Sequence, residues 1–348
     1  MPPGSCRRFS RARVFSQPTS LVGGRTPPSQ NPRVKDCDHM CCGVVTMASA
    51  WSDSADAYTA NLEERTDDSV PYLGMVVGRK LVVTRVASVL AGKDSPVVLD
   101  VAAAGGEPAI SMAKEIPHAT VHGTDFAPGM VEVIRKRGEA AGVSNLKASV
   151  EDGQLLAGFE DGSVDVVTCT WGLESMPDCG KAIEQFYRVV KPGGMALFAA
   201  WDKDPNSIAL KMFRVISTLK QGDGPELDIQ PLGGDAGMKA MEDAGFASVT
   251  ASQVLIPFYV PPGFGLRDIF PYMVNPTPVN GVFTAMEKEG RVNVREEAAT
   301  IFESQTLEDM ARGQAPTGPG LPDANHAGGP VEPSFYMKAI LVEGHKTG

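Results

Sequence analysis

The sequence predicts an α/β protein built on a doubly wound, mostly parallel sheet of seven strands. Short apolar runs typical of buried strands alternate with segments of helical periodicity between residues 97 and 259. Turn signals such as Pro192-Gly193-Gly194 separate them. Such alternation places helices on both faces of a parallel sheet, and ligands then bind at the carboxyl ends of the strands.

The first half of the predicted domain begins with helical segments. We expect a helix at 50–58, followed by a mostly helical run to Leu90 with apolar residues at helical spacing. The run Val97–Val101 is apolar and ends at small residues, which indicates a buried parallel strand. The next expected elements are strands at 119–124, 146–150 and 164–170, and a helix at 128–141.

The second half continues the alternation of strands and helices, and its composition then changes. Further helices are expected at 178–190 and 236–244, and further strands at 195–201, 247–259 and 334–342. The segment 261–333 is rich in Pro and Gly and predicts a cap or long lid loop. We therefore divide the chain into a leader (1–46), a main domain with an N-terminal helical segment (47–260), the cap (261–333), and a last strand with a tail (334–348).

The leader is basic. Its first 35 residues carry seven Arg or Lys and no acidic residue, and they are rich in Ser and Pro. This composition is typical of a transit peptide, which would direct the protein to a plastid or mitochondrion. The alternatives are a disordered basic tail or a true start at Met47, and either would leave the protein in the cytoplasm.

The charge and composition of the chain argue against several classes of binding partner. The formal net charge is -10, which argues against nucleic acid as the main partner, because phosphate binding needs a basic surface. No apolar run reaches the length of a transmembrane segment. Cys37, His39, Cys41 and Cys42 lie together in the leader, but no second ligand pair follows at zinc-site spacing, so we predict no metal.

Three features fall at the carboxyl ends of consecutive predicted strands. The run from Asp100 to Gly106 is made of small residues that let a ligand approach the backbone. Asp125 ends the second strand, 19 residues after Gly106, where a carboxylate can accept both hydroxyls of a ribose. Asp152 and Gly153 follow the third strand, where a carboxylate can accept from an exocyclic amine.

Four segments carry a resemblance to a known family. They are VVLDVAAAGGEPAI (97–110), VHGTDFAPGMVEVIRKR (121–137), EDGQLLAGFEDGSVDVVTCTWGLESMPD (151–178) and YRVVKPGGMALFAAW (187–201). The run PLGGDAGMKAMEDAGF (231–246) matches the family's last helix. The chain resembles class I S-adenosyl-L-methionine (SAM)-dependent methyltransferases with a type 11 methyltransferase domain, a group that includes quinone and other small-molecule methyltransferases.

The resemblance implies a Rossmann-like fold, SAM as cofactor and a small-molecule acceptor. It places Asp100, Ala102, Ala104 and Gly106 around the methionine part of SAM. It implies that Asp125 holds the ribose, with Phe126 and Met130 near the adenine, and that Asp152 and Gly153 bind the adenine edge. Thr170 and Trp171 would lie beside the sulfonium, and Tyr58 and Thr66 would close over the cofactor.

The glycine loop departs from the family pattern. Ala102 and Ala104 stand where the family usually has its first two glycines. An alanine with a positive φ is strained, so we expect the neighbouring Gly105 to absorb the turn.

The general base is not evident from the sequence. Methyl transfer from a sulfonium is a direct displacement that needs alignment, and it needs a base only when the nucleophile arrives protonated. Glu174 and His326 are the weak candidates. The apolar stripe at 208–216 is expected to face the core or to form one wall of a pocket for an apolar acceptor.

Two other functions remain open at this point. A methyltransferase fold that binds partners without turnover fits Ala104 and the missing base. An NAD(P)-dependent oxidoreductase shares the first two strand-end features, but it should carry Gly-x-Gly-x-x-Gly. Residues 102–107 read Ala-Ala-Ala-Gly-Gly-Glu instead. The sequence leaves the oligomeric state open.

Overall fold

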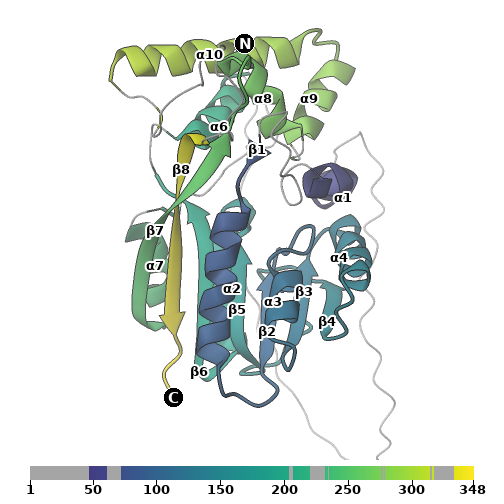
Figure 1. Ribbon diagram of the computed structural model, residues 1–348, viewed down its shortest axis with the longest axis vertical. Coiled ribbons are helices and arrows are strands. Elements are labelled where there is room, and N and C mark those ends of the chain that lie inside the picture. Colours follow the sequence, from purple (N-terminus) through teal and green to yellow (C-terminus); the bar gives the residue numbers. More distant parts are fainter. Residues whose placement is uncertain are drawn as a thin grey trace, which may run out of the picture. The chain divides into compact units, whose positions relative to one another are not determined.

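The computed structural model describes residues 47–60, 72–203, 207–219, 232–233, 235–275, 277, 279–313, 316 and 333–348. These residues form one sheet with the strand order β1-β7-β8-β6-β5-β2-β3-β4 (Figure 1). The five strands from β6 to β4 in this order are parallel, and β8, β7 and β1 extend the sheet in antiparallel pairs. The strands are β1 (Tyr72–Leu73), β2 (Val97–Val101), β3 (Thr120–Asp125), β4 (Leu146–Val150), β5 (Val164–Thr170), β6 (Val190–Trp201), β7 (Ala247–Tyr259) and β8 (Pro333–His345).

The doubly wound, mostly parallel sheet is confirmed, and all seven predicted strands are present. The additional strand β1 has only two residues. The helices of the described residues are α1 (Met47–Tyr58), α2 (Val76–Leu90), α3 (Ala109–Glu115), α4 (Pro128–Ala140), α5 (Cys179–Val189), α6 (Ile208–Leu219), α7 (Asp235–Asp243), α8 (Leu266–Val274), α9 (Val279–Lys288) and α10 (Val294–Ala311), with a 3-10 turn at Leu173–Ser175.

Alternate residues of the central strands supply two separate cores. In β6, Met195 and Leu197 pack with α2 and α3 on one face, whereas Ala196 and Phe198 pack with α5 and α7 on the other. Successive side chains of a strand point to opposite faces, so a strand covered on both faces must be apolar throughout. This explains why the predicted strands appear as continuous apolar runs.

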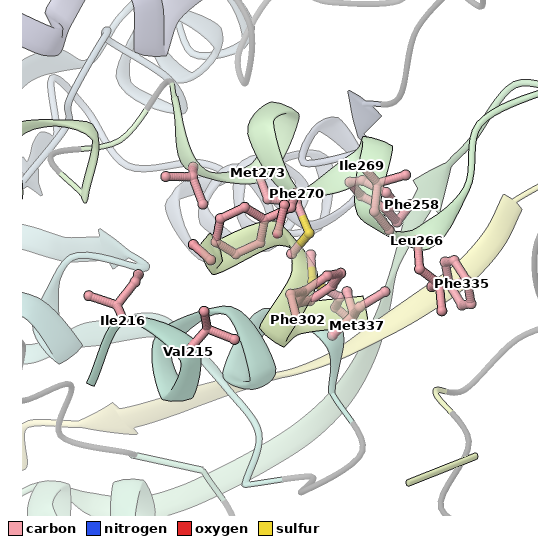
Figure 2. Close-up of a cluster of buried hydrophobic side chains, with 14 of the residues drawn as sticks. Val215, Ile216, Phe258, Leu266, Ile269, Phe270, Met273, Phe302, Phe335 and Met337 are labelled. Atoms are coloured by element: carbon pink, nitrogen blue, oxygen red, sulfur yellow. The ribbon is translucent and has the colours of Figure 1, made fainter. Parts of the chain in front are cut away.

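A third core lies under the cap and is shown in Figure 2. Val215 and Ile216 of α6 belong to the same cluster as Phe270 of α8 and Phe302 of α10. The long strands β7 and β8 contribute further side chains to it, namely Phe258, Phe335 and Met337. The cap is therefore anchored on the antiparallel part of the sheet.

The segment 261–333 was expected to form a cap or a long lid loop. Its described part contains α8, α9 and α10, so that part is a helical cap and the loop alternative is wrong for it. The buried residues of α10 include Val294, Ala298, Phe302 and Thr306, one turn apart. Among the described Pro and Gly residues of this segment, only Pro271 and Gly281 lie inside helices. The buried stripe is the signal that composition obscured.

Two boundaries also differ from the prediction. The helical run to Leu90 is interrupted by β1, whose residues pair with Phe258 and Tyr259 of β7. The turn expected at 192–194 lies inside β6, because Val190 already pairs with Val164 of β5. Within the described residues, no helix combines the length and the apolar character that crossing a bilayer requires.

Candidate functional site

The strand order reverses at β2, which has β3 and β4 on one side and β5 and β6 on the other. The loop after β2, residues 102–108, therefore stands at the switch point where ligands bind in such sheets. It is held against β3 by the backbone N–H of Ala103, which donates to Thr124 O at 2.8 Å. On the β5 side, a Cβ added to Gly172 would lie 2.5 Å from the Cβ of Ala102. The loop thus contacts both neighbours.

Asp125 joins this loop to the end of β3. Its Oδ2 accepts from the backbone N–H of Ala104 at 3.0 Å, and its Oδ1 accepts from that of Ala127 at 2.9 Å. The side chain is buried, and this burial raises the pKa of Asp125 to about 6, against the opposing effect of the backbone N–H groups. Each oxygen keeps acceptor capacity for a further donor, because a carboxylate offers about four lone-pair sites.

The turn after β4 is hydrogen-bonded to the same end of β3. The backbone N–H of Glu151 donates to the carbonyl oxygen of Asp125 at 3.0 Å. Asp152 is exposed, and its Oδ1 accepts from the backbone N–H of Gln154 at 2.8 Å. Gly153 is buried and lies against Val101 of β2. Three consecutive strand ends are thus connected by hydrogen bonds and close contacts.

Asp100 is placed differently from the other acidic residues. It is fully buried, and its Oδ1 accepts from the hydroxyl of Thr168 at 2.6 Å. It therefore links β2 to β5 inside the sheet, below the rim. Its effect on a bound ligand is indirect, through the position of the loop that follows it.

The backbone of the loop is strained at two alanines. Ala102 has φ 55°, Ala104 has φ 48° and Gly106 has φ 104°. The expectation that Gly105 would absorb the turn is wrong, since the left-handed residues are the alanines on either side of Ala103. Strain of this kind costs about 1–3 kcal/mol per residue and is kept where the surroundings impose it. Arg137 of α4, which the sequence did not single out, donates to the carbonyl oxygen of Gly105.

Helix α1 lies against the first turn of α4. The hydroxyl of Ser52 accepts from the backbone N–H of Gly129 at 3.1 Å. Trp51 and Tyr58 pack edge to face, with ring centroids 5.5 Å apart, and both join a cluster that includes Ala104 and Met130. Tyr58, which was expected to close over the cofactor, thus packs in the same cluster as Ala104 of the loop.

The predicted adenine neighbours differ in exposure. Phe126 is 39% exposed and available to a ligand, whereas Met130 is fully buried in the cluster with α1. Met130 therefore contributes to the packing around the site and is not exposed to a ligand. Thr66 lies outside the described residues.

The end of β5 forms the other side of the site. Thr170 is its last residue, and Trp171 follows with φ 56° and donates from its backbone N–H to Ala199 O at 2.8 Å. The indole of Trp171 lies beside that of Trp201, with centroids 5.4 Å apart. Trp201, at the end of β6, is a site neighbour that the sequence did not reveal, because an aromatic residue ending an apolar strand is an ordinary core pattern.

Glu174, one of the two candidate bases, lies below this tryptophan pair. Its Oε1 accepts from the backbone N–H of Trp201 at 3.0 Å. Burial raises the pKa of Glu174 to about 8, so the carboxyl group is mostly protonated at pH 7. The geometry gives it a positional role at neutral pH. The other candidate, His326, lies outside the described residues.

Comparison with known families agrees with this geometry. Residues 98–194 match the model of a family described as a methyltransferase domain. This part of the chain is therefore similar to a methyltransferase domain. The matched range includes the loop after β2, Asp125, the turn after β4 and Trp171, which are the parts of the site described above.

Curated relatives match over part of their length. A demethylmenaquinone methyltransferase of Thermus thermophilus is 33% identical over 118 residues, which is 34% of this chain and 53% of that protein. The corresponding enzyme of Listeria monocytogenes is 37% identical over 98 residues, 28% of this chain and 41% of that protein. The chain spans about half the length of the curated relatives it matches.

Solved structures share the fold of the methyltransferase domain. YcgJ of Bacillus subtilis superposes with a TM-score of 0.51 at 20% identity, covering 78% of this chain and 99% of that one. Phosphoethanolamine N-methyltransferase 2 of Haemonchus contortus, solved with SAM, gives 0.52 at 14% identity, covering 88% of this chain and 61% of that one. At these identities the likeness concerns the fold alone.

A groove on the cap is separate from the strand ends. Its volume is about 570 Å³, and it lies between α8 and α10. Arg267 and Glu296 line it and form an ion pair at 2.6 Å, and Arg295 pairs with Glu287 at 2.8 Å. None of its lining residues belongs to the methyltransferase family match. We therefore place the candidate site at the strand ends.

Proposed function

We propose that this chain is a SAM-dependent methyltransferase that transfers a methyl group to a small-molecule acceptor by direct displacement. The family match of residues 98–194 supports the reaction class. Three connected strand ends, each with the predicted type of residue, support the nucleoside site. In the enzyme classification this is a methyltransferase of the group EC 2.1.1.-.

The observation that carries the proposal is the position of Asp125. Its carboxylate accepts from the loop after β2, while its carbonyl oxygen accepts from the turn after β4. A ribose that donates its two hydroxyls to this carboxylate would have the loop on one side and Asp152 on the other. The exposed ring of Phe126 follows Asp125 directly and would pack against the base.

The residues present fit SAM. Ala102 to Gly106 offer short side chains and a strained backbone that a ligand can approach closely, and Asp152 is exposed at the rim. Bound SAM would supply a methyl group already activated by the sulfonium. The protein would hold the donor and the acceptor in line, and positioning of this kind contributes about 7–11 kcal/mol to lowering a barrier.

The acceptor is inferred to be a small apolar molecule. The bacterial relatives described above are named demethylmenaquinone methyltransferases, and a small-molecule acceptor agrees with that name. Trp171 and Trp201, at the ends of β5 and β6, pack against the apolar core of the cap, so apolar side chains lie next to these strand ends. A nucleic acid acceptor does not fit the acidic chain.

Calorimetric titration of the full chain with SAM, S-adenosylhomocysteine and NADH tests the cofactor. We expect both SAM and its demethylated product to bind at one site and NADH to fail. Asp125→Asn should weaken SAM binding, while Glu132→Gln, which removes an exposed charge on α4, should not. Thermal unfolding of both variants separates a lost contact from a lost fold.

The outcomes separate the competing functions. Binding of NADH alone would support the oxidoreductase. Binding of SAM without methyl transfer from labelled donor to any component of a cell extract would support the degenerate binding protein. Equal SAM affinity of Asp125→Asn and the wild type would refute the ribose role.

We also propose that residues 1–46 are a transit peptide that directs the protein to a plastid or mitochondrion. The support is the seven basic and zero acidic residues among the first 35. A fluorescent fusion of the full chain should reach an organelle, and the mature protein should begin near Met47. A cytoplasmic fusion with an intact leader would refute it.

A further inference from the structure

The indole of Trp171 carries a buried N–H group that has no hydrogen-bond partner among the described residues. Indole N–H is a donor only, and a buried donor normally finds an acceptor. An acceptor for this N–H would therefore have to come from outside the described residues.

The position of Trp171 joins the cofactor loop to the cap. The next residue, Gly172, lies so close to Ala102 that an added Cβ would be 2.5 Å from the Cβ of Ala102. The Trp171 side chain packs against the apolar core formed by α6, α8, α10, β7 and β8. A molecule that contacts this indole would thus lie between the loop and the cap.

Several neighbouring residues hold the indole of Trp171 in one orientation. A Cβ added to Gly78 of α2 would lie 2.6 Å from Cη2 of Trp171, so only glycine lets the ring pack there. Trp201 packs beside the ring at 5.4 Å, and the Trp171 backbone has the left-handed φ of 56°. A bulky residue with positive φ is uncommon and persists where its surroundings fix it.

We propose that Trp171 determines acceptor specificity, with its indole N–H donating to an oxygen of the methyl acceptor. The inference rests on the proposed function and adds a chemical class to it. The acceptor is a small apolar molecule that carries a hydrogen-bond-accepting oxygen, such as a ketone or enolate oxygen, close to the atom that receives the methyl group. Its remaining surface packs against Trp171, Trp201 and the cap.

Two probes of nearly equal shape test this. 2-Acetonaphthone carries a carbonyl oxygen that only accepts, and 2-isopropenylnaphthalene replaces that oxygen with a methylene group. We expect the full chain, saturated with S-adenosylhomocysteine, to bind the ketone about tenfold more tightly, as the loss of one neutral hydrogen bond implies. Trp171→Phe should remove that preference, whereas Trp201→Phe, which keeps the Trp171 N–H, should retain it.

Spectroscopy locates the contact. The chain has three tryptophans, so a ¹⁵N-labelled sample gives three indole N–H signals, and Trp171→Phe identifies the relevant one. That signal should shift downfield with the ketone and less with the alkene.

Equal affinity for the two probes, no binding of either, or an unmoved Trp171 signal would overturn the proposal and assign the N–H to trapped water. Failure of S-adenosylhomocysteine to bind, measured separately, would instead refute the proposed function.

Discussion

The backbone N–H of Ala104 donates to the carboxylate of Asp125 across 3.0 Å, although Ala104 itself has the strained φ of 48°. The hydrogen bond ties the loop after β2 to the end of β3, where we propose that SAM binds. The strain in the loop and the burial of the carboxylate therefore belong to one arrangement, and both can be measured.

Cofactor affinity should depend on the protonation of Asp125. Desolvation raises the pKa of Asp125 to about 6, and ribose hydroxyls donate to the charged form. We expect the dissociation constant of S-adenosylhomocysteine to increase about tenfold per pH unit as the pH falls below 6. Calorimetry between pH 4.5 and 8 measures this. Asp125→Asn should bind weakly with a flatter profile, and an identical slope in both proteins would contradict the assignment.

The strained alanine should be improved by glycine. Ala104→Gly removes the cost of a left-handed alanine, which outweighs the added freedom of the unfolded chain, so we expect a gain of about 0.5–1 kcal/mol in the free energy of unfolding. Ala103→Gly is the matched control. Ala103 is 1% exposed and lies outside the left-handed region, so the same change should cost about 1 kcal/mol. Denaturant titration compares the two, and equal losses would show that φ at Ala104 carries no strain.

The close approach of the cofactor loop to the residue after Trp171 should appear as a coupled pair. Gly172→Ala brings a Cβ within 2.5 Å of the Cβ of Ala102 and should cost about 1–3 kcal/mol of stability through overpacking. The double variant with Ala102→Gly should recover most of this loss. Additive effects in the double-mutant cycle would mean that the two residues are not in contact.

Glu174 should make the protein lose stability as the pH rises from acidic values to about 8. Burial raises the pKa of Glu174 to about 8 in the folded chain, above its value in the unfolded chain. Its contribution to stability is therefore fully present below the unfolded pKa of 4.5 and is lost as the pH rises from there to about 8, by roughly 1.4 kcal/mol per pH unit. Above pH 8 both states are ionised and the loss stops. Glu174→Gln keeps an acceptor for Trp201 N–H and removes the titration. The stability difference between the two proteins should change between pH 5 and 8 and level off above pH 8, and a constant difference across the whole range would contradict the burial.

The ion pair in the cap should respond asymmetrically to substitution. Lys211 of α6 is 1% exposed and pairs with Asp309 of α10, which is 19% exposed. Asp309→Ala leaves a buried lysine without its counter-ion and should cost about 3–5 kcal/mol, whereas Lys211→Met leaves a partly exposed carboxylate and should cost less. Asp243→Ala, which breaks the exposed pair with Lys239, serves as the control and should cost under about 1 kcal/mol. Equal costs for the two cap variants would contradict the burial of Lys211.

The sequence predicted the parallel part of the fold well, because strands covered on both faces must be apolar throughout. The bounds of β2 and β5, which are buried along nearly their whole length, agree with the prediction. The prediction failed where the composition of a segment suggests a loop but the spacing of its apolar residues indicates a helix. In the cap, the many Pro and Gly residues of the segment obscured the buried stripe of α10, and β1, which has two residues, is too short to leave a pattern.

The candidate site was predictable to the extent that topology brings strand ends together. Asp125 and the turn after β4 follow from that rule. The contacts of Arg137, Ser52 and Trp201 do not, since each depends on how a helix or strand end packs in three dimensions. The φ values of Ala102 and Ala104 likewise depend on the loop's hydrogen bonds, which no local propensity for alanine reveals.

Hydrogen–deuterium exchange of the full chain, with and without S-adenosylhomocysteine, tests the central claim most directly. We expect the ligand to slow exchange at three separated segments: 102–108, 125–130 and 151–156. The groove between α8 and α10 should be unaffected. Protection confined to that groove, or to one of the three segments alone, would contradict a nucleoside site shared by three strand ends.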